Sequence, residues 1–197
     1  MPRKRRSFKR PSGERRYRKM FVIAAEGVKT EPQYFALLND LHAVIHVTCL
    51  KDKHSSSPLQ VLKRMTKYLR EQDLKKSDEA WLVVDKDNWT DSQLQELHQW
   101  SRTADNYGFA LSNPSFEYWL LLHFEDGTGI SNARECSDHL RRYLPDYDKS
   151  INSRKITREM IEEAISRASN RDSPRCEDWP HKIGTTVYRL VQNIVRA

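Results

Sequence analysis

The sequence lacks the features that indicate several common classes of protein. Its three cysteines are far apart and form no CxxC pair, so they indicate neither a disulfide framework nor a zinc site. There is no Walker A motif, no GxGxxG and no GxSxG, which argues against an intrinsic NTPase and a serine hydrolase. No apolar run approaches the roughly 18 residues of a membrane span, and no apolar segment follows the basic N-terminus as in a signal peptide. We therefore expect a soluble, cytoplasmic protein with no membrane partner.

Positive charge is concentrated at the N-terminus. The chain of 197 residues has a formal charge of +7, but residues 1–20 hold ten Lys or Arg against the single acid Glu14. The remaining 24 Lys or Arg and 26 Asp or Glu leave the rest of the chain at −2. A segment so basic and so poor in aliphatic residues is expected to stay mobile until it meets a polyanion.

We predict that residues 1–19 form a flexible tail that binds the phosphates of a nucleic acid. The basic side chains expected to make these contacts are Arg3, Lys4, Arg5, Arg6, Lys9, Arg10, Arg15, Arg16 and Arg18. The alternative is a tail that only keeps the protein soluble.

Short apolar runs alternate with helical patterns over the first two thirds of the chain. Runs at 20–25, 44–50, 80–84 and 107–111 are typical of buried strands, and apolar residues recur at helical spacing between them. Four strands separated by helices favour a parallel, doubly wound α/β sheet, which binds ligands at the carboxyl ends of its strands.

In the last third of the chain the sequence predicts only helices. Helical patterns cover residues 131–144, 156–170 and 184–196, and no further strand is evident. Besides the tail, we therefore expect an α/β core at 20–126 and a helical extension at 127–197 packed on that core.

Acidic residues follow two of the predicted strands. Glu26 comes directly after the first run, and Asp85 and Asp87 come after the third. Because the carboxyl ends of parallel strands meet at one edge of a sheet, we expect these three side chains to converge. Burying several carboxylates together is costly unless they meet a hard cation with a preference for oxygen ligands. Mg²⁺ fits, because it binds one or two carboxylates while keeping waters and phosphate oxygens.

The pattern of Glu26-Gly27 after one strand and Asp85-x-Asp87 after another resembles the Toprim domain of topoisomerases, primases and phage-defence nucleases. The segments FVIAAEGVKTEPQYF, WLVVDKDNW and SNPSFEYWLLLHFE, followed by a C-terminus that ends in TTVYRLVQNI, are similar to the RloB family of restriction-locus proteins. This resemblance covers roughly residues 20–195.

The resemblance implies a Toprim-like parallel sheet of about four strands flanked by helices, with a helical C-terminal extension. It implies a metal-dependent nuclease of a bacterial anti-phage system that cleaves DNA or a structured RNA such as tRNA. Mapped onto this sequence, it makes Glu26 the general acid/base and a metal ligand, and Asp85 and Asp87 the other ligands. Mg²⁺ is the implied cofactor, with Mn²⁺ as the expected substitute. Some similar nucleases work beside an ABC-type ATPase; such a partner, and a homo-oligomer, stay open.

Two further glutamates are candidate metal ligands. Glu31 lies near the start of the helix after the first strand, and Glu117 lies near the start of the helix after the fourth. Either glutamate is placed to hold a second ion. The alternative for both is an ordinary acid in the first turn of a helix, stabilised by the macrodipole.

Asn113 and Lys29 are candidates for contact with a nucleic acid. Ser112 and Asn113 are expected to cap the helix after the fourth strand, with Pro114 in its first turn, and free N–H groups at a helix start favour phosphate. Lys29 and Lys86 are candidates for neutralising charge in the transition state, and the alternative for each is an ordinary solvated lysine.

Two other functions stay open. A receiver-like phospho-signalling domain is also doubly wound, with a phosphoacceptor where Asp85 lies and a hydroxyl where Ser112 lies. Against it, a fifth strand and its terminal Lys are missing from the sequence, and a receiver does not need an Asp at position 87. In a non-catalytic nucleic-acid-binding adaptor, the acids would bind metal only to order the fold.

Overall fold

The computed structural model describes residues 19–41, 45–50, 57–87, 89–148, 151 and 155–197. The nine basic residues predicted to form the nucleic-acid contacts of the tail lie outside the described residues. The first strand begins at Lys19, which is the last residue of the tail predicted at residues 1–19.

The fold is α/β, as predicted, and is built on a mostly parallel sheet. Its strands are β1 (Lys19–Ala25), β2 (Ile45–Leu50), β3 (Glu79–Asp85), β4 (Tyr107–Asn113) and β5 (Gly184–Thr185). They lie in the order β2-β1-β3-β4-β5, and the first four in this order are parallel. The short strand β5 pairs with β4 in the antiparallel direction.

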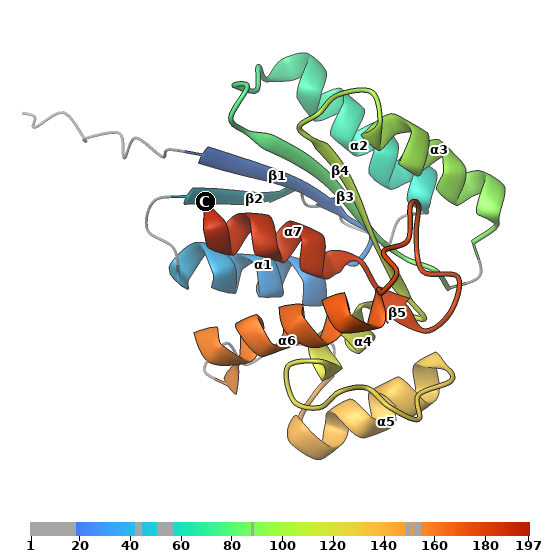
Figure 1. Cartoon of the computed structure of the whole chain (residues 1–197). Coiled ribbons are helices and arrows are strands. Elements are labelled where there is room, and N and C mark those ends of the chain that lie inside the picture. Colours follow the sequence, from blue (N-terminus) through green and yellow to red (C-terminus); the bar gives the residue numbers. More distant parts are fainter. Residues whose placement is uncertain (1–18, 42–44, 51–56, 88, 149–150, 152–154) are drawn as a thin grey trace, which may run out of the picture.

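Helices cover both faces of the sheet (Figure 1). They are α1 (Thr30–Leu41), α2 (Pro58–Glu71), α3 (Asp91–Ser101), α4 (Phe116–Leu121), α5 (Ala133–Tyr143), α6 (Arg158–Arg171) and α7 (Val187–Arg196). Helices α2 and α3 lie on one face, whereas α1, α6 and α7 lie on the other. None of the helices in the described part of the chain is long and apolar enough to cross a membrane.

Alternate residues of each central strand pack into two separate cores. Val22 and Leu82 belong to the core beneath α2 and α3, whereas Phe21, Ile23 and Val83 belong to the core on the opposite face. All five side chains are buried. Burial on both faces explains why the strands appear in the sequence as continuous apolar runs and not as alternating patterns.

The strand β5 was not predicted. The segment 184–196 was expected to be one helix, but Gly184 and Thr185 extend the sheet and α7 begins only at Val187. The Thr185 Oγ1 atom lies 2.8 Å from Ser112 Oγ of β4. A strand of two residues has no periodicity of its own, so only its pairing with β4 reveals it.

The strand order creates a crevice between β1 and β3. The chain leaves β1 through α1 toward β2 on one side, and leaves β3 through α3 toward β4 on the other. The two connections also cover opposite faces of the sheet (Figure 1). The carboxyl ends of β1 and β3 therefore form the topological switch point at which doubly wound sheets bind their ligands.

Candidate metal centre

A cleft of about 540 Å³ opens at this switch point, and its lining is strongly acidic. All five predicted acidic residues line it, together with one that was not predicted: Glu26, Glu31, Asp85, Asp87, Glu117 and Asp148. Lys29 is the sole Lys or Arg among its described lining residues. Six carboxylates against one ammonium group make the cleft a place where a cation is favoured.

Glu26 joins the ends of the two central strands. Its backbone N–H donates to the Val83 carbonyl at 3.0 Å and so continues the β1–β3 ladder by one residue. Its Oε2 accepts the Asp85 N–H at 3.2 Å, and its Oε1 accepts the Trp89 indole N–H at 3.1 Å. Burial raises the pKa of Glu26 to about 7, although these two hydrogen bonds act in the opposite direction. Glu26 is therefore a carboxyl group able to gain or lose a proton near neutral pH.

Asp85 is the last residue of β3 and is surrounded by other acids. Burial, followed by the negative charges of Glu31, Glu117 and Glu26, raises its pKa well above the ordinary range. A backbone hydrogen bond from Phe116 opposes this effect. Negative charge on the three neighbouring glutamates therefore makes ionisation of Asp85 more costly.

Glu31 lies in the first turn of α1 and is buried. Its Oε1 accepts the Gly27 N–H at 2.9 Å. A Cβ atom at position 27 would overlap the Glu31 carboxylate, so the glycine after Glu26 makes room for this second acid.

Glu117 lies in the first turn of α4 and is also buried. It accepts a hydrogen bond of 3.0 Å from the Tyr147 hydroxyl, which itself lies 3.3 Å from Thr30 Oγ1. Tyr147 comes from the segment after α5, and sequence reasoning missed it, as it missed the neighbouring Asp148. No strand end or motif marks either residue.

Asp87 lines the cleft from a turn and is exposed. Strand β3 ends at Asp85, and Asp87 has a φ of 31°, a left-handed backbone conformation that Asp tolerates better than most residues. The two aspartates therefore reach the cleft from different backbone conformations.

The donor chemistry of the cleft fits Mg²⁺, but its side chains are not arranged around an ion. No group of three His, Cys, Asp or Glu side chains among the described residues could hold a metal in its present conformation. Several of the carboxylates instead accept hydrogen bonds from the protein, among them Glu26, Glu31 and Glu117. Rotation of these side chains toward the cleft would expose their oxygens to a cation, and a hard cation would remove their mutual repulsion.

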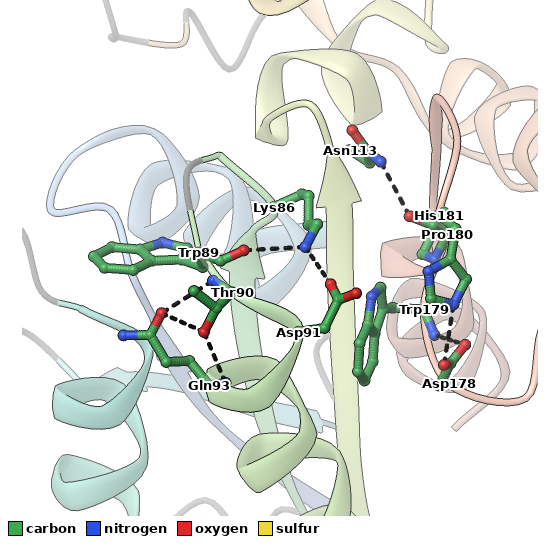
Figure 2. Close-up of polar contacts among 10 residues, drawn as sticks. All are labelled: Lys86, Trp89, Thr90, Asp91, Gln93, Asn113, Asp178, Trp179, Pro180 and His181. Carbon is green, nitrogen blue, oxygen red and sulfur yellow. Dashed lines mark hydrogen bonds and ion pairs between the residues drawn. The ribbon is translucent and has the colours of Figure 1, made fainter.

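Lys29 and Asn113, the other predicted contact residues, differ in position. Lys29 is exposed and lines the cleft. The prediction that Asn113 lies at a helix start is wrong, because Asn113 is the last residue of β4 and α4 begins at Phe116 after the N-cap Ser115. Figure 2 shows the Asn113 side chain donating instead to the Pro180 carbonyl at 3.1 Å.

The arrangement does not favour a receiver-like domain. Ser112 is fully buried, its hydroxyl is bonded to Thr185, and it is absent from the cleft lining. The strand beside β4 is antiparallel, whereas a receiver needs a parallel fifth strand. Lys86, next to Asp85, forms an ion pair of 2.6 Å with Asp91 (Figure 2) and is absent from the cleft lining.

Comparison with known proteins identifies one family. A family model described as RloB-like protein matches residues 21–194, which include every acidic residue of the cleft. No curated protein and no solved structure matches the chain.

Proposed function

The chain belongs to the RloB-like protein family, and from this membership and its acidic cleft we propose that it is a metal-dependent nuclease of the Toprim type. The observation that carries the proposal is the convergence of carboxylates from β1, β3, α1 and α4 at one switch point. Such a cluster is costly for stability alone, because burial and like charge raise the pKa values of Glu26 and Asp85. Sites that perturb carboxyl groups in this way are typical of catalytic centres.

In the proposed mechanism Asp85 and Asp87 would hold Mg²⁺, for which Mn²⁺ would substitute, and Glu31 and Glu117 would supply oxygens for a second ion. When bound, the metal would supply positive charge to neutralise the scissile phosphate. Glu26 accepts the proton of the attacking oxygen or donates one to the leaving oxygen, a role that suits a carboxyl group with a pKa of about 7.

Neighbouring side chains position these acids. Trp89 holds one oxygen of Glu26 through its indole N–H, and Tyr147 holds one oxygen of Glu117. Lys29, at the edge of the cleft, is placed to contact a substrate phosphate.

The proposed substrate is DNA or a structured RNA such as tRNA, and the proposed role is anti-phage defence. Family membership and the resemblance of the Glu26 and Asp85-x-Asp87 pattern to Toprim nucleases support this role. The ten basic residues in the first 20 supply the charge expected to attract a polyanion. An ABC-type ATPase partner belongs to the same proposal.

The test is to incubate the purified protein with Mg²⁺ or Mn²⁺ and a panel of plasmid, single-stranded DNA and total tRNA. We expect cleavage of at least one substrate, lost in Glu26→Ala and Asp85→Ala and in the presence of EDTA. Glu159→Ala, which removes an exposed acid on α6, is the matched control and should cleave like wild type. Circular dichroism checks that each variant is folded.

Two results would count against the proposal. Full activity in folded Glu26→Ala or Asp85→Ala would place the chemistry elsewhere. Absence of any metal-dependent cleavage, with nucleic-acid binding retained, would favour the adaptor.

A further inference from the structure

Arginine side chains gather in a second cavity, beside the C-terminal end of α3. This cavity has a volume of about 640 Å³ and is lined by His98, Arg102, Arg175, Cys176, Glu177 and Arg189. We call it the arginine pocket. Three arginines and one glutamate line it. Arg189 is paired with Asp172, so the positive charge of the pocket comes from Arg102 and Arg175 and is opposite in sign to that of the acidic cleft.

Two of the three arginines are free to bind a ligand. Arg102 and Arg175 are exposed, and neither forms an ion pair with a carboxylate in the described part of the chain. Arg189 is held in place: its Nη2 donates to Asp172 Oδ2 at 2.6 Å and to the Cys176 carbonyl at 2.8 Å. Its Nε is buried, so Arg189 forms a fixed wall of the pocket, and the exposed Arg102 and Arg175 supply the free donors. Planar guanidinium groups with free donors match the oxygens of a phosphate.

A well-anchored segment connects the arginine pocket with the carboxyl end of β4. Trp179 is buried, and its ring lies 6.0 Å from that of His98 and 6.2 Å from that of Phe109. The next residue, Pro180, accepts the hydrogen bond from Asn113 (Figure 2). Arg175 is therefore carried by a segment that is fixed to the sheet a few residues farther on.

The two sites lie at opposite ends of α3. Trp89, just before this helix, lines the acidic cleft, and Arg102, just after it, lines the arginine pocket. A helix of 11 residues is on the order of 16 Å long, which roughly five phosphates of one strand of helical DNA would span. One nucleic-acid strand is thus long enough to reach both.

We propose that the arginine pocket binds a backbone phosphate of the nucleic acid whose cleaved segment occupies the acidic cleft. This inference rests on the proposed nuclease function. A cleft with six carboxylates repels a polyanion, and residues 21–197 are slightly acidic overall, so substrate binding needs cationic contacts away from the reacting centre. The arginine pocket supplies such contacts within reach of one strand.

The experiment compares two double variants of the full chain that lose the same charge. Arg102→Gln with Arg175→Gln removes the exposed arginines of the pocket. Arg134→Gln with Arg158→Gln removes exposed arginines of α5 and α6 that are paired with acids of their own helices. Binding of labelled single-stranded DNA, duplex DNA and tRNA is measured by fluorescence anisotropy in EDTA, over a series of salt concentrations.

We expect the pocket variant to bind at least one probe roughly tenfold more weakly than the control variant. The slope of log affinity against log salt should fall by about 1.4 for single strands, or about 1.8 for duplex DNA, because two phosphate contacts disappear. The probe that is affected identifies DNA or RNA as the ligand.

Equal affinities of the two double variants would overturn the proposal, whether both match wild type or both are weakened by the same factor. Because binding is measured without metal, this result is independent of cleavage. If wild type cleaves nothing with Mg²⁺ but the pocket variant alone binds weakly, the nuclease proposal fails and the phosphate site stands.

Discussion

The Glu26 carboxylate accepts the backbone N–H of Asp85 at 3.2 Å, so the side chain directly after β1 is fastened to the last residue of β3. Both residues have raised pKa values, because both are desolvated and both face other acids. The contact places two carboxyl groups that repel each other at the center of the switch-point cleft. The free energy of unfolding, the affinity for metal and the protonation of these carboxyl groups should therefore depend on one another.

Metal-free protein should become less stable as the pH rises through 7. The pKa of Glu26 is about 7 in the fold against an ordinary value of 4.5, so the fold favours its protonated form. That stabilisation is fully present below pH 4.5 and is lost as the pH rises through the folded pKa. We expect a larger free energy of unfolding at about pH 6 than at about pH 8 in EDTA, measured by urea denaturation.

Mg²⁺ should reverse this trend, because it binds the deprotonated carboxylates and so stabilises the fold more at the higher pH. Glu26→Gln should flatten the dependence in EDTA, because the amide does not titrate. If the free energy of unfolding in EDTA changes with pH by the same amount in Glu26→Gln and in wild type, Glu26 does not control this pH dependence.

Trp89→Phe should raise the pKa of Glu26 further. The indole N–H donates to Glu26 Oε1 and favours the charged carboxylate, and phenylalanine keeps an aromatic ring but has no donor. If the Glu26 carboxylate binds metal, the pH at which Mg²⁺ affinity reaches half its maximum should move upward, as measured by isothermal titration calorimetry. Trp100→Phe, at a partly buried indole on α3 outside the cleft, is the control. An unshifted midpoint in Trp89→Phe would contradict the role assigned to this hydrogen bond.

Gly27→Ala should weaken metal binding with little effect on stability. The new methyl group would overlap the Glu31 carboxylate, and the flexible end of that side chain is able to move away at small cost. Its hydrogen bond from the Gly27 N–H would be lost or distorted, and the acid would leave its present place in the cleft. We expect Mg²⁺ affinity to fall by about tenfold, with a change in unfolding free energy below about 1 kcal/mol. A second glycine-to-alanine variant, Gly129→Ala, is no suitable control, because Gly129 has a φ of 80°, a backbone conformation that alanine rarely adopts. Glu31→Gln therefore serves as the comparison. Unchanged Mg²⁺ affinity in both variants would exclude Glu31 as a ligand.

His123 should make the protein less stable in acid. Its ring is buried, its Nδ1 lies 3.0 Å from the Trp119 carbonyl, and its Nε2 lies 3.1 Å from the Tyr34 hydroxyl. Burial lowers the pKa of His123 from 6.5 to about 4, because the fold favours the neutral ring. The stability that this ring contributes is present above pH 6.5 and is lost as the pH falls toward 4.

His123→Phe removes this titration. We expect the stability difference between wild type and His123→Phe to shrink by up to about 3 kcal/mol between pH 7.5 and pH 4, as measured by urea denaturation at a series of pH values. A difference in unfolding free energy between wild type and His123→Phe that stays constant from pH 7.5 to pH 4 would contradict the prediction.

The sequence alone determined the local elements of the sheet and its principal acids. The runs that became β1, β3 and β4 are apolar on both faces, and this pattern depends only on burial of each strand between helices. Glu26, Asp85 and Asp87 were recognisable because each follows such a run, and the parallel order of the strands implies that their ends meet. The predicted fold class and the suspected family are both confirmed.

Only the tertiary structure decided which distant residues complete each site. Asp148 and Tyr147 reach the acidic cleft from beyond α5, and the amide of Asn113 is taken by Pro180, 67 residues later in the chain. The arginine pocket likewise joins Arg102 to Arg175 and Arg189. Local patterns follow from the period of a single helix or strand, whereas these contacts depend on how separate elements pack, and no local signal in the sequence encodes that packing.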